Sequence, residues 1–320
     1  MSESPQFIGR KYSDEERADL REVLMERSKD SLRPLEGEFE KTPEELHIIE
    51  VANDLLRMEL DSLGIPNYRS IEPARVHMLT GDVYTKHFPH LASAWGHVTS
   101  STDMIVVNKE FAASPLIQFA VTLHEMIHRA STMRFYEPKN GRITTARSGY
   151  KINSPWKETL GYDELAGFNE TIVEYTEKKI VANESNTLQR EFGVSNDALQ
   201  RIPYPYAIYA PLLHTISRGI AANKEIPIQR VLDTLERGQF QKTILALKDL
   251  EPAFGKGALR VLACLGALSD PSARTHIDNM VSQYFDTENE NDRFDTMARI
   301  REVFEKYLKR QVVKAAPANR

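Results

Sequence analysis

Hydrophobic residues recur at helical spacing along most of this chain, and several polar positions mark where the helices begin. Residues 42–63 place their apolar side chains on one stripe, which predicts an amphipathic helix. Thr42 can cap it, Pro43 suits the first turn, and Glu45 completes a capping box. The more polar stretch 11–33 has a narrower apolar stripe. It predicts a second helix whose surface is mostly solvated.

The pattern changes between residues 73 and 109. Three runs there, RVHML, SAWGHVTSS and DMIVVN, are short, rich in β-branched residues, and broken by Gly, Pro and Asp. Such runs predict the strands of a small sheet. Helical spacing returns at 115–136 and at 164–182, the second helix being capped by Asp163. The stretch 142–155 between them is typical of a β-hairpin or an extended loop.

Helical patterns then dominate residues 195–312, and Asp270 followed by Pro271 marks one helix start. The polar stretch 183–195 is the best candidate for a domain boundary. We therefore expect an α+β fold that is mostly α, with a small mixed sheet and a helical C-terminal region. The expected divisions are an N-terminal helical segment at 1–69, a domain containing the sheet at 70–185, the helical region at 195–312 and a tail at 313–320.

Composition and charge exclude several classes of protein. The 320 residues are 41% hydrophobic and 27% charged, with a net charge of −5. Because broad nucleic-acid binding needs a basic surface, this balance argues against a nucleic-acid partner. The sequence contains no apolar run of membrane-spanning length and no apolar leader, so we expect no membrane partner. Its single cysteine, Cys264, suits a reducing compartment, and we expect a cytoplasmic protein.

The stretch TLHEMIHRA, residues 122–130, carries the most specific chemical signal. Positions four apart lie on one helix face, so His124 and His128 can direct both imidazoles at one zinc ion. Glu125 lies about 100° around the helix from His124, where its carboxylate can take a proton from a metal-activated water. The alternative is an ordinary amphipathic helix that carries two histidines and a glutamate.

A third ligand is available downstream in GFNETIVEY, residues 167–175. Glu170 and Glu174 are four apart on the next predicted helix. One of them can bind the metal while the other accepts a hydrogen bond from the far nitrogen of a ligand histidine. The alternative for this pair is a solvated acidic face. The apolar residues between the two glutamates weaken that alternative because they would partly bury the helix.

HEMIH followed by NETIVE resembles the gluzincin metallopeptidases, the thermolysin-like clan, and is similar to small gluzincin-like proteins including minigluzincins. The resemblance covers roughly residues 93–182 and implies a zincin-like domain. It implies that His124, His128 and Glu170 bind one Zn²⁺ per chain, that Glu125 is the general base, and that Glu174 supports a zinc histidine. The resemblance also implies that a strand before the motif helix, SAWGHVTSS or DMIVVN, pairs with the substrate backbone.

Such enzymes offer a Tyr or His to the oxyanion. The stretch RIPYPYAIYAPLLHTIS supplies candidates. Tyr206 is the expected residue, and the alternatives are Tyr204, Tyr209 and His214. The predicted function is a zinc metallopeptidase that acts on a peptide or protein substrate. The alternative is a noncatalytic or narrowly specific regulatory or binding protein on the same fold.

Overall fold

The computed structural model describes residues 6–8, 13–66, 68–99, 102–136, 144–153, 163–241, 245–268 and 270–315. They form two compact units, each assembled from two separate stretches of chain. The first comprises Met1–Thr145 and Val173–Tyr204, and the second Ala146–Ile172 and Pro205–Arg320. These units differ from the continuous divisions expected from the sequence. The described residues are mainly helical with small sheets, so the expected α+β, mostly α class is confirmed.

The first unit contains the predicted three-stranded sheet, in the order β2–β4–β3. Its strands are β2 (Val76–Leu79), β3 (Gly96–Thr99) and β4 (Met104–Asn108). β2 runs parallel to β4, whereas β3 is an edge strand antiparallel to β4. A further pair joins β1 (Gln6–Ile8) and β5 (Met133–Tyr136) in parallel. All three strands predicted between residues 73 and 109 are therefore present.

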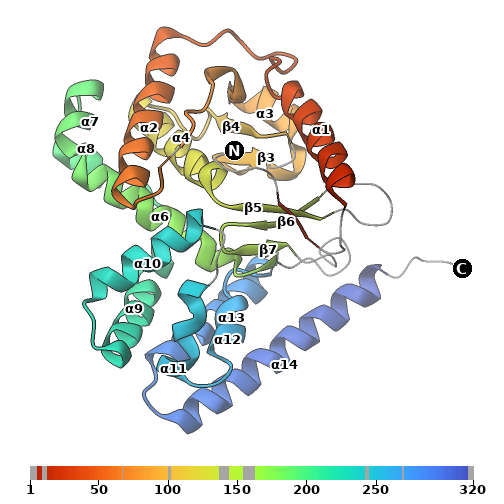
Figure 1. The fold of residues 1–320 in the computed structure, drawn as a ribbon, viewed down its shortest axis with the longest axis vertical. Helices are drawn as coiled ribbons and strands as arrows, with labels where there is room; N and C mark the ends of the chain where they lie inside the picture. Colours follow the sequence, from red (N-terminus) through yellow and green to blue (C-terminus); the bar gives the residue numbers. More distant parts are fainter. Residues whose placement is uncertain are drawn as a thin grey trace, which may run out of the picture. The chain divides into compact units, whose positions relative to one another are not determined.

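Helices cover both faces of this sheet. The helix α4 (Pro115–Ala130) packs on β3, β4 and α2 (Pro43–Ser62), as Figure 1 shows. On the other face, Tyr84 of α3 (Gly81–His87) joins a buried cluster with Leu79, Met104 and Val106. Other helical elements among the described residues of this unit are α1 (Asp14–Asp30), η1 (Pro73–Arg75), η2 (Pro89–Leu91), α7 (Ser185–Phe192), α8 (Asn196–Gln200) and the part of α6 (Ala166–Asn183) from Val173 onward.

Most of the helix starts predicted from the sequence are confirmed by the structure. Thr42 Oγ1 accepts the Glu45 amide at 3.2 Å, and Glu45 Oε2 accepts the Thr42 amide at 2.8 Å, which completes the predicted capping box. Asp270 caps α13 (Pro271–Asp286) by accepting the Ala273 amide at 2.8 Å. One predicted cap is wrong. Asp163 lies in β8 (Asp163–Glu164), and α6 (Ala166–Asn183) begins three residues later.

One predicted helix end is also wrong, and the stretch expected as a domain boundary contains a helix. The helix expected at 115–136 ends at Ala130, because Ser131 adopts an extended conformation and the alternating residues that follow form β5. The polar stretch 183–195, expected as a boundary, contains α7 instead. Leu188 anchors α7 because its side chain is fully buried. The compact units divide after Tyr204.

The second unit contains an antiparallel hairpin followed by helices. β6 (Thr144–Ser148) pairs with β7 (Lys151–Asn153), and β7 pairs with β8. This confirms a hairpin within 142–155, although residues 142–143 and 154–155 lie outside the described residues. The helical elements of the C-terminal region are η3 (Ala207–Tyr209), α9 (Ala210–Lys224), α10 (Ile228–Phe240), η4 (Leu245–Asp249), α11 (Leu250–Phe254), α12 (Ala258–Ala263), α13 and α14 (Glu290–Ala315).

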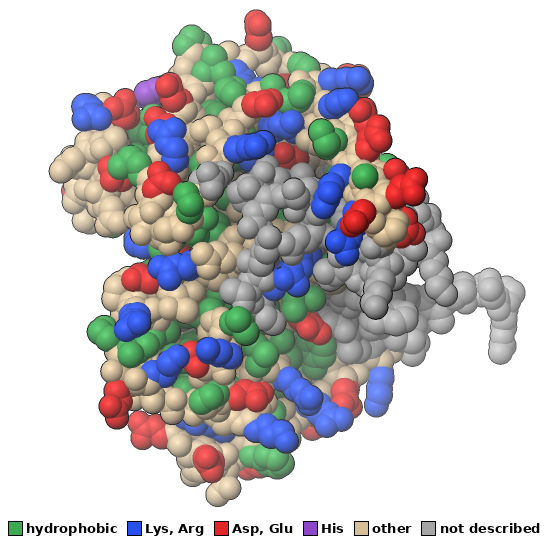
Figure 2. All heavy atoms as spheres, viewed as in Figure 1, with side chains coloured by type: hydrophobic (Ala, Val, Ile, Leu, Met, Phe, Trp, Pro, Cys, Tyr) green, Lys and Arg blue, Asp and Glu red, His purple; other side chains and the backbone are tan. Residues whose placement is uncertain are grey.

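The predicted helical character of 195–312 is therefore confirmed in its described parts. α14 extends to Ala315, into the predicted tail 313–320, and residues 316–320 lie outside the described residues. Within the described chain, every helix is too short or too polar to cross a bilayer. Acidic and basic side chains are interspersed over the face in Figure 2, in keeping with 41 Lys and Arg against 46 Asp and Glu.

Candidate metal centre

The motif HEMIH lies on α4, as its helical spacing predicts. Ser114 caps the helix by accepting the Ile117 amide at 3.3 Å, and Pro115 occupies the first turn. The apolar stripe of the helix is buried, including Phe119, Leu123, Met126 and Ile127. Burial of that stripe fixes the rotation of the helix, so His124 and His128 share one partly buried face.

The two imidazoles approach each other through their Nε2 atoms. The Nε2 atoms of His124 and His128 are 3.2 Å apart, and the ring planes are inclined at 70°. Two nitrogens that each bind zinc at about 2.0–2.1 Å in a tetrahedral site are separated by about 3.3 Å. The histidine pair therefore has the spacing that a shared metal ion requires.

Glu170 completes a group of three. The ligand atoms of His124, His128 and Glu170 lie within 4.8 Å of one another, and all three side chains are partly buried. Two imidazoles and one carboxylate are a donor set that zinc accepts, with a further position left for water. Among the described residues this group contains Glu170 and not Glu174, its alternative. These three residues fit a metal ion.

A second carboxylate, from Glu177, holds the far side of the first histidine. Glu177 Oε2 lies 3.0 Å from His124 Nδ1. A neutral imidazole that donates its Nδ1 proton to this carboxylate keeps its Nε2 lone pair directed at the metal position. Burial raises the pKa of Glu177, while its hydrogen bond with His124 lowers it. This contact therefore holds the orientation of the His124 ring.

Glu177 was not among the residues singled out from the sequence. It follows Glu170 by seven residues, or about two helical turns, so the two lie on nearly the same face of α6. This seven-residue spacing is the feature of the sequence that could have identified Glu177. Glu174 was expected to support a ligand histidine, and Glu177 is the carboxylate that lies against His124 Nδ1. Glu174 is buried, and its Oε1 accepts a hydrogen bond from Lys178 Nζ at 2.7 Å.

Glu125 is buried beside the edge strand β3. A Cβ atom added to Gly96 would lie 3.0 Å from Glu125 Cγ and 2.9 Å from Val121 Cγ1. The same atom would lie 3.0 Å from the carbonyl oxygen of Val106, so the backbone of β3 has no free space on this side. Glycine at position 96 therefore lets the edge strand pass directly against the side chain of Glu125.

The four oxyanion candidates have different surroundings. Tyr209 donates its hydroxyl proton to Asp278 Oδ2 at 2.6 Å, so that proton is already engaged. Tyr206, which precedes η3, is partly buried and stacks on Tyr209 with ring centroids 6.5 Å apart. His214 is exposed on α9.

Tyr204 lies in the first unit near the α6 carboxylates. Burial raises the pKa of Tyr204, and the negative charges of Glu177 and Glu174 raise it further. Lys178 Nζ stands 4.5 Å from the centre of its ring. Burial and the two carboxylates keep the phenol protonated, which is the form that can donate a hydrogen bond.

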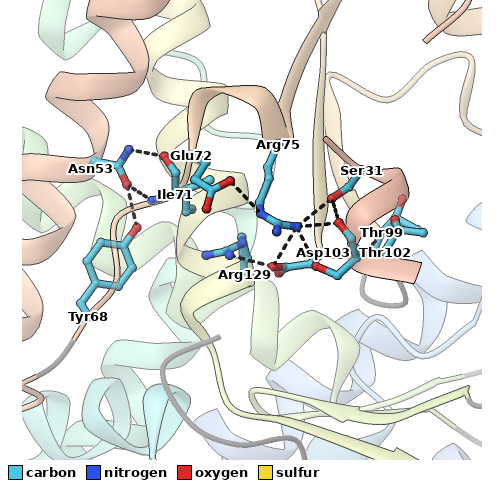
Figure 3. Close-up of polar contacts among 11 residues, drawn as sticks. Ser31, Asn53, Tyr68, Ile71, Glu72, Arg75, Thr99, Thr102, Asp103 and Arg129 are labelled. Atoms are coloured by element: carbon cyan, nitrogen blue, oxygen red, sulfur yellow. Dashed lines mark hydrogen bonds and ion pairs between the residues drawn. The ribbon is translucent and has the colours of Figure 1, made fainter. Parts of the chain in front are cut away.

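The last turn of α4 is anchored by a buried charge cluster (Figure 3). Arg129, which directly follows His128, donates from Nη2 to Asp103 Oδ2 at 2.8 Å. Arg75 Nη1 lies 3.6 Å from the same oxygen and donates to Ser31 Oγ at 2.8 Å. Asp103, in the β3–β4 turn, therefore links the helix that carries the histidines to the edge strand.

Comparison with known proteins gives no relative for this chain. No protein-family model matches it, no curated protein matches it, and no solved structure matches it.

Proposed function

We propose that the chain is a zinc-dependent metallopeptidase related to the gluzincins, with one Zn²⁺ per chain. The observation that supports this most is the convergence of the His124 and His128 Nε2 atoms, 3.2 Å apart, together with Glu170. The Glu177 carboxylate on His124 Nδ1 adds to it, because metal-binding histidines are usually held in this way. On this proposal the small sheet with α4 and α6 is a zincin-like unit.

Zinc in such a site would polarise the substrate carbonyl and lower the pKa of a bound water. Glu125 would accept the proton of the attacking water and then deliver it to the leaving amine. Tyr206 is the proposed hydrogen-bond donor to the oxyanion. Tyr204 is the alternative, because burial and two nearby carboxylates raise the pKa of its phenol. The edge strand β3 offers its backbone to an extended peptide, which matches a peptide or protein substrate.

The first experiment is the metal content of the purified full chain, wild type and variants. We expect about one zinc per wild-type chain and loss of zinc in both His128→Ala and Glu170→Ala. His276→Ala is the matched control, since this exposed histidine lies on α13. Absence of zinc from the wild-type protein after incubation with zinc would contradict the proposal.

The second experiment separates catalysis from metal binding. Glu125→Gln removes the base but none of the three ligands, so this variant should keep zinc and lose hydrolysis of a peptide library. Because removal of an essential catalytic group costs several orders of magnitude, the loss should be complete within a standard assay. If the wild type binds zinc but cleaves no peptide, the site serves the binding or regulatory role instead.

A further inference from the structure

A buried carboxylate in the second unit has a hydrogen-bond donor at each oxygen. Asp278, on α13, accepts the Gly266 amide on Oδ1 at 2.7 Å and the Tyr209 hydroxyl on Oδ2 at 2.6 Å. Burial raises the pKa of Asp278, and these two hydrogen bonds lower it. With both oxygens engaged, the carboxylate is held in one orientation. It thereby fixes the backbone of Gly266.

Gly266 is in direct backbone contact with the first turn of α6. A Cβ atom added to Gly266 would lie 2.6 Å from both Cα and N of Gly167. Gly167 donates its amide to the Leu265 carbonyl at 2.8 Å. Gly266 also has a φ of +64°, in the left-handed region that favours glycine. Two glycines are therefore needed for this contact.

Further hydrogen bonds attach the same segment, residues 263–267, to the chain that leads into α6. The Leu165 amide donates to the Ala263 carbonyl at 3.0 Å, and the Asp163 amide donates to the Ala267 carbonyl at 3.1 Å. The first amides of a helix have no partner within the helix, so outside carbonyls define where it begins. Segment 263–267 thus sets the position of the start of α6.

Glu170 follows Gly167 by three residues, one helical turn along α6. A shift of that first turn would move the Glu170 carboxylate by a similar amount. We infer that Asp278 is a positioning residue for Glu170, acting through the backbone contact of Gly266 with Gly167. The inference rests on the proposed metal site, because it assigns Asp278 a role in holding one of the three ligands. If Asp278 has this role, α13 of the C-terminal helical region contributes to the proposed metal site.

The test measures zinc affinity of the full chain by competition with a chromophoric chelator. Asp278→Leu keeps a similar side-chain size but cannot accept the Gly266 amide, whereas Asp278→Asn keeps an acceptor oxygen. Groups that orient a metal ligand usually contribute about 10–100-fold to affinity. We expect Asp278→Leu to bind zinc about tenfold more weakly or worse and Asp278→Asn to remain near wild type. Equal affinity of Asp278→Leu and wild type would overturn the inference.

A glycine pair keeps the test decisive if Asp278→Leu fails to fold. Gly266→Ala introduces both backbone strain and the clash with Gly167. Gly193→Ala is the matched control, since Gly193 has a φ of +62° but nothing within 4 Å of an added Cβ. We expect zinc affinity to fall in Gly266→Ala and to be unchanged in Gly193→Ala. Equal affinities in the two variants would overturn the inference.

The wild-type result separates the two proposals. If the wild-type chain binds no zinc, the proposed metal site fails and the role of Asp278 fails with it. If the wild type binds zinc and the Asp278 and Gly266 variants bind it equally well, the metal site stands and the inference alone is wrong.

Discussion

Glu177 Oε2 lies 3.0 Å from Nδ1 of His124, although the two residues are 53 positions apart in the chain. The buried carboxylate leaves the opposite ring nitrogen facing His128 and Glu170. This single contact therefore connects the helix of the HEMIH motif to the helix of the downstream glutamates.

Glu177→Gln should weaken zinc binding without removing a ligand. The neutral amide stabilises the Nδ1 proton of His124 less well than the carboxylate, so we expect a loss of about tenfold in zinc affinity. Chelator competition on the purified chain measures it. Glu302→Gln, at an exposed position on α14, is the control and should bind zinc as the wild type does. Unchanged affinity in Glu177→Gln would show that Glu177 does not orient the histidine.

Gly96→Ala should separate metal binding from catalysis. The new methyl group would meet Glu125 Cγ at 3.0 Å and the Val106 carbonyl oxygen at 3.0 Å. Since the backbone oxygen cannot rotate away, the strand or the Glu125 side chain must move. We expect one zinc per chain to be retained and peptide hydrolysis to fall about 100-fold, as misplaced catalytic groups usually cause. Hydrolysis at the wild-type rate would indicate that Glu125 tolerates the displacement.

Asp103→Asn should destabilise the first unit strongly. The carboxylate of Asp103 is the acceptor for Arg129 and lies 3.6 Å from Arg75, and all three side chains are largely buried. Removing one partner of a buried ion pair typically costs about 3–5 kcal/mol, because the other charge is left uncompensated. Urea unfolding of the metal-free chain measures the change.

The matched control for Asp103→Asn is an exposed ion pair. Arg301 and Glu305 on α14 are 2.8 Å apart, with side chains that are 80% and 51% exposed. Glu305→Gln should therefore change stability by less than about 1 kcal/mol. If the two substitutions have equal effects, the buried cluster does not anchor α4 as inferred.

Acid should destabilise the sheet through His97. The Tyr84 hydroxyl is hydrogen-bonded to His97 Nδ1 at 2.8 Å, and burial lowers the pKa of this histidine to about 4, with a smaller contribution from His90. An unfolded histidine has a pKa of about 6.5, so the unfolded chain binds the proton more readily. The contribution of His97 is therefore present above about pH 6.5 and is lost as the pH falls toward 4.

The size of this effect is at most about 3 kcal/mol, the free energy that corresponds to such a pKa difference. Urea unfolding at pH 7 and pH 5 should show a smaller stability loss in His97→Gln than in the wild type. Comparing the two chains cancels the titration of carboxylates that both contain. His276→Gln, at an exposed position, should retain the wild-type pH dependence. Parallel losses in wild type and His97→Gln would contradict the assignment.

Much of the local structure could be read from the sequence. The capping box at Thr42 and the Asp270 cap of α13 were predicted correctly, because caps depend on residues a few positions apart. The predicted ends of helices were less accurate than their predicted starts. At Ser131 a helical pattern is followed directly by strand residues, and no Gly or Pro marks the end of α4.

Short-range sequence pattern is enough to specify the capped helix that carries His124, Glu125 and His128, because a four-residue spacing on a helix fixes which side chains share a face. It left Glu170 and Glu174 as alternative ligands. Tertiary structure grouped Glu170 with the two histidines, placed Glu177 on His124 and placed Gly96 beside Glu125. Those relationships join segments far apart in the chain. They depend on how the buried faces of the helices and the sheet pack together, which no short-range pattern specifies.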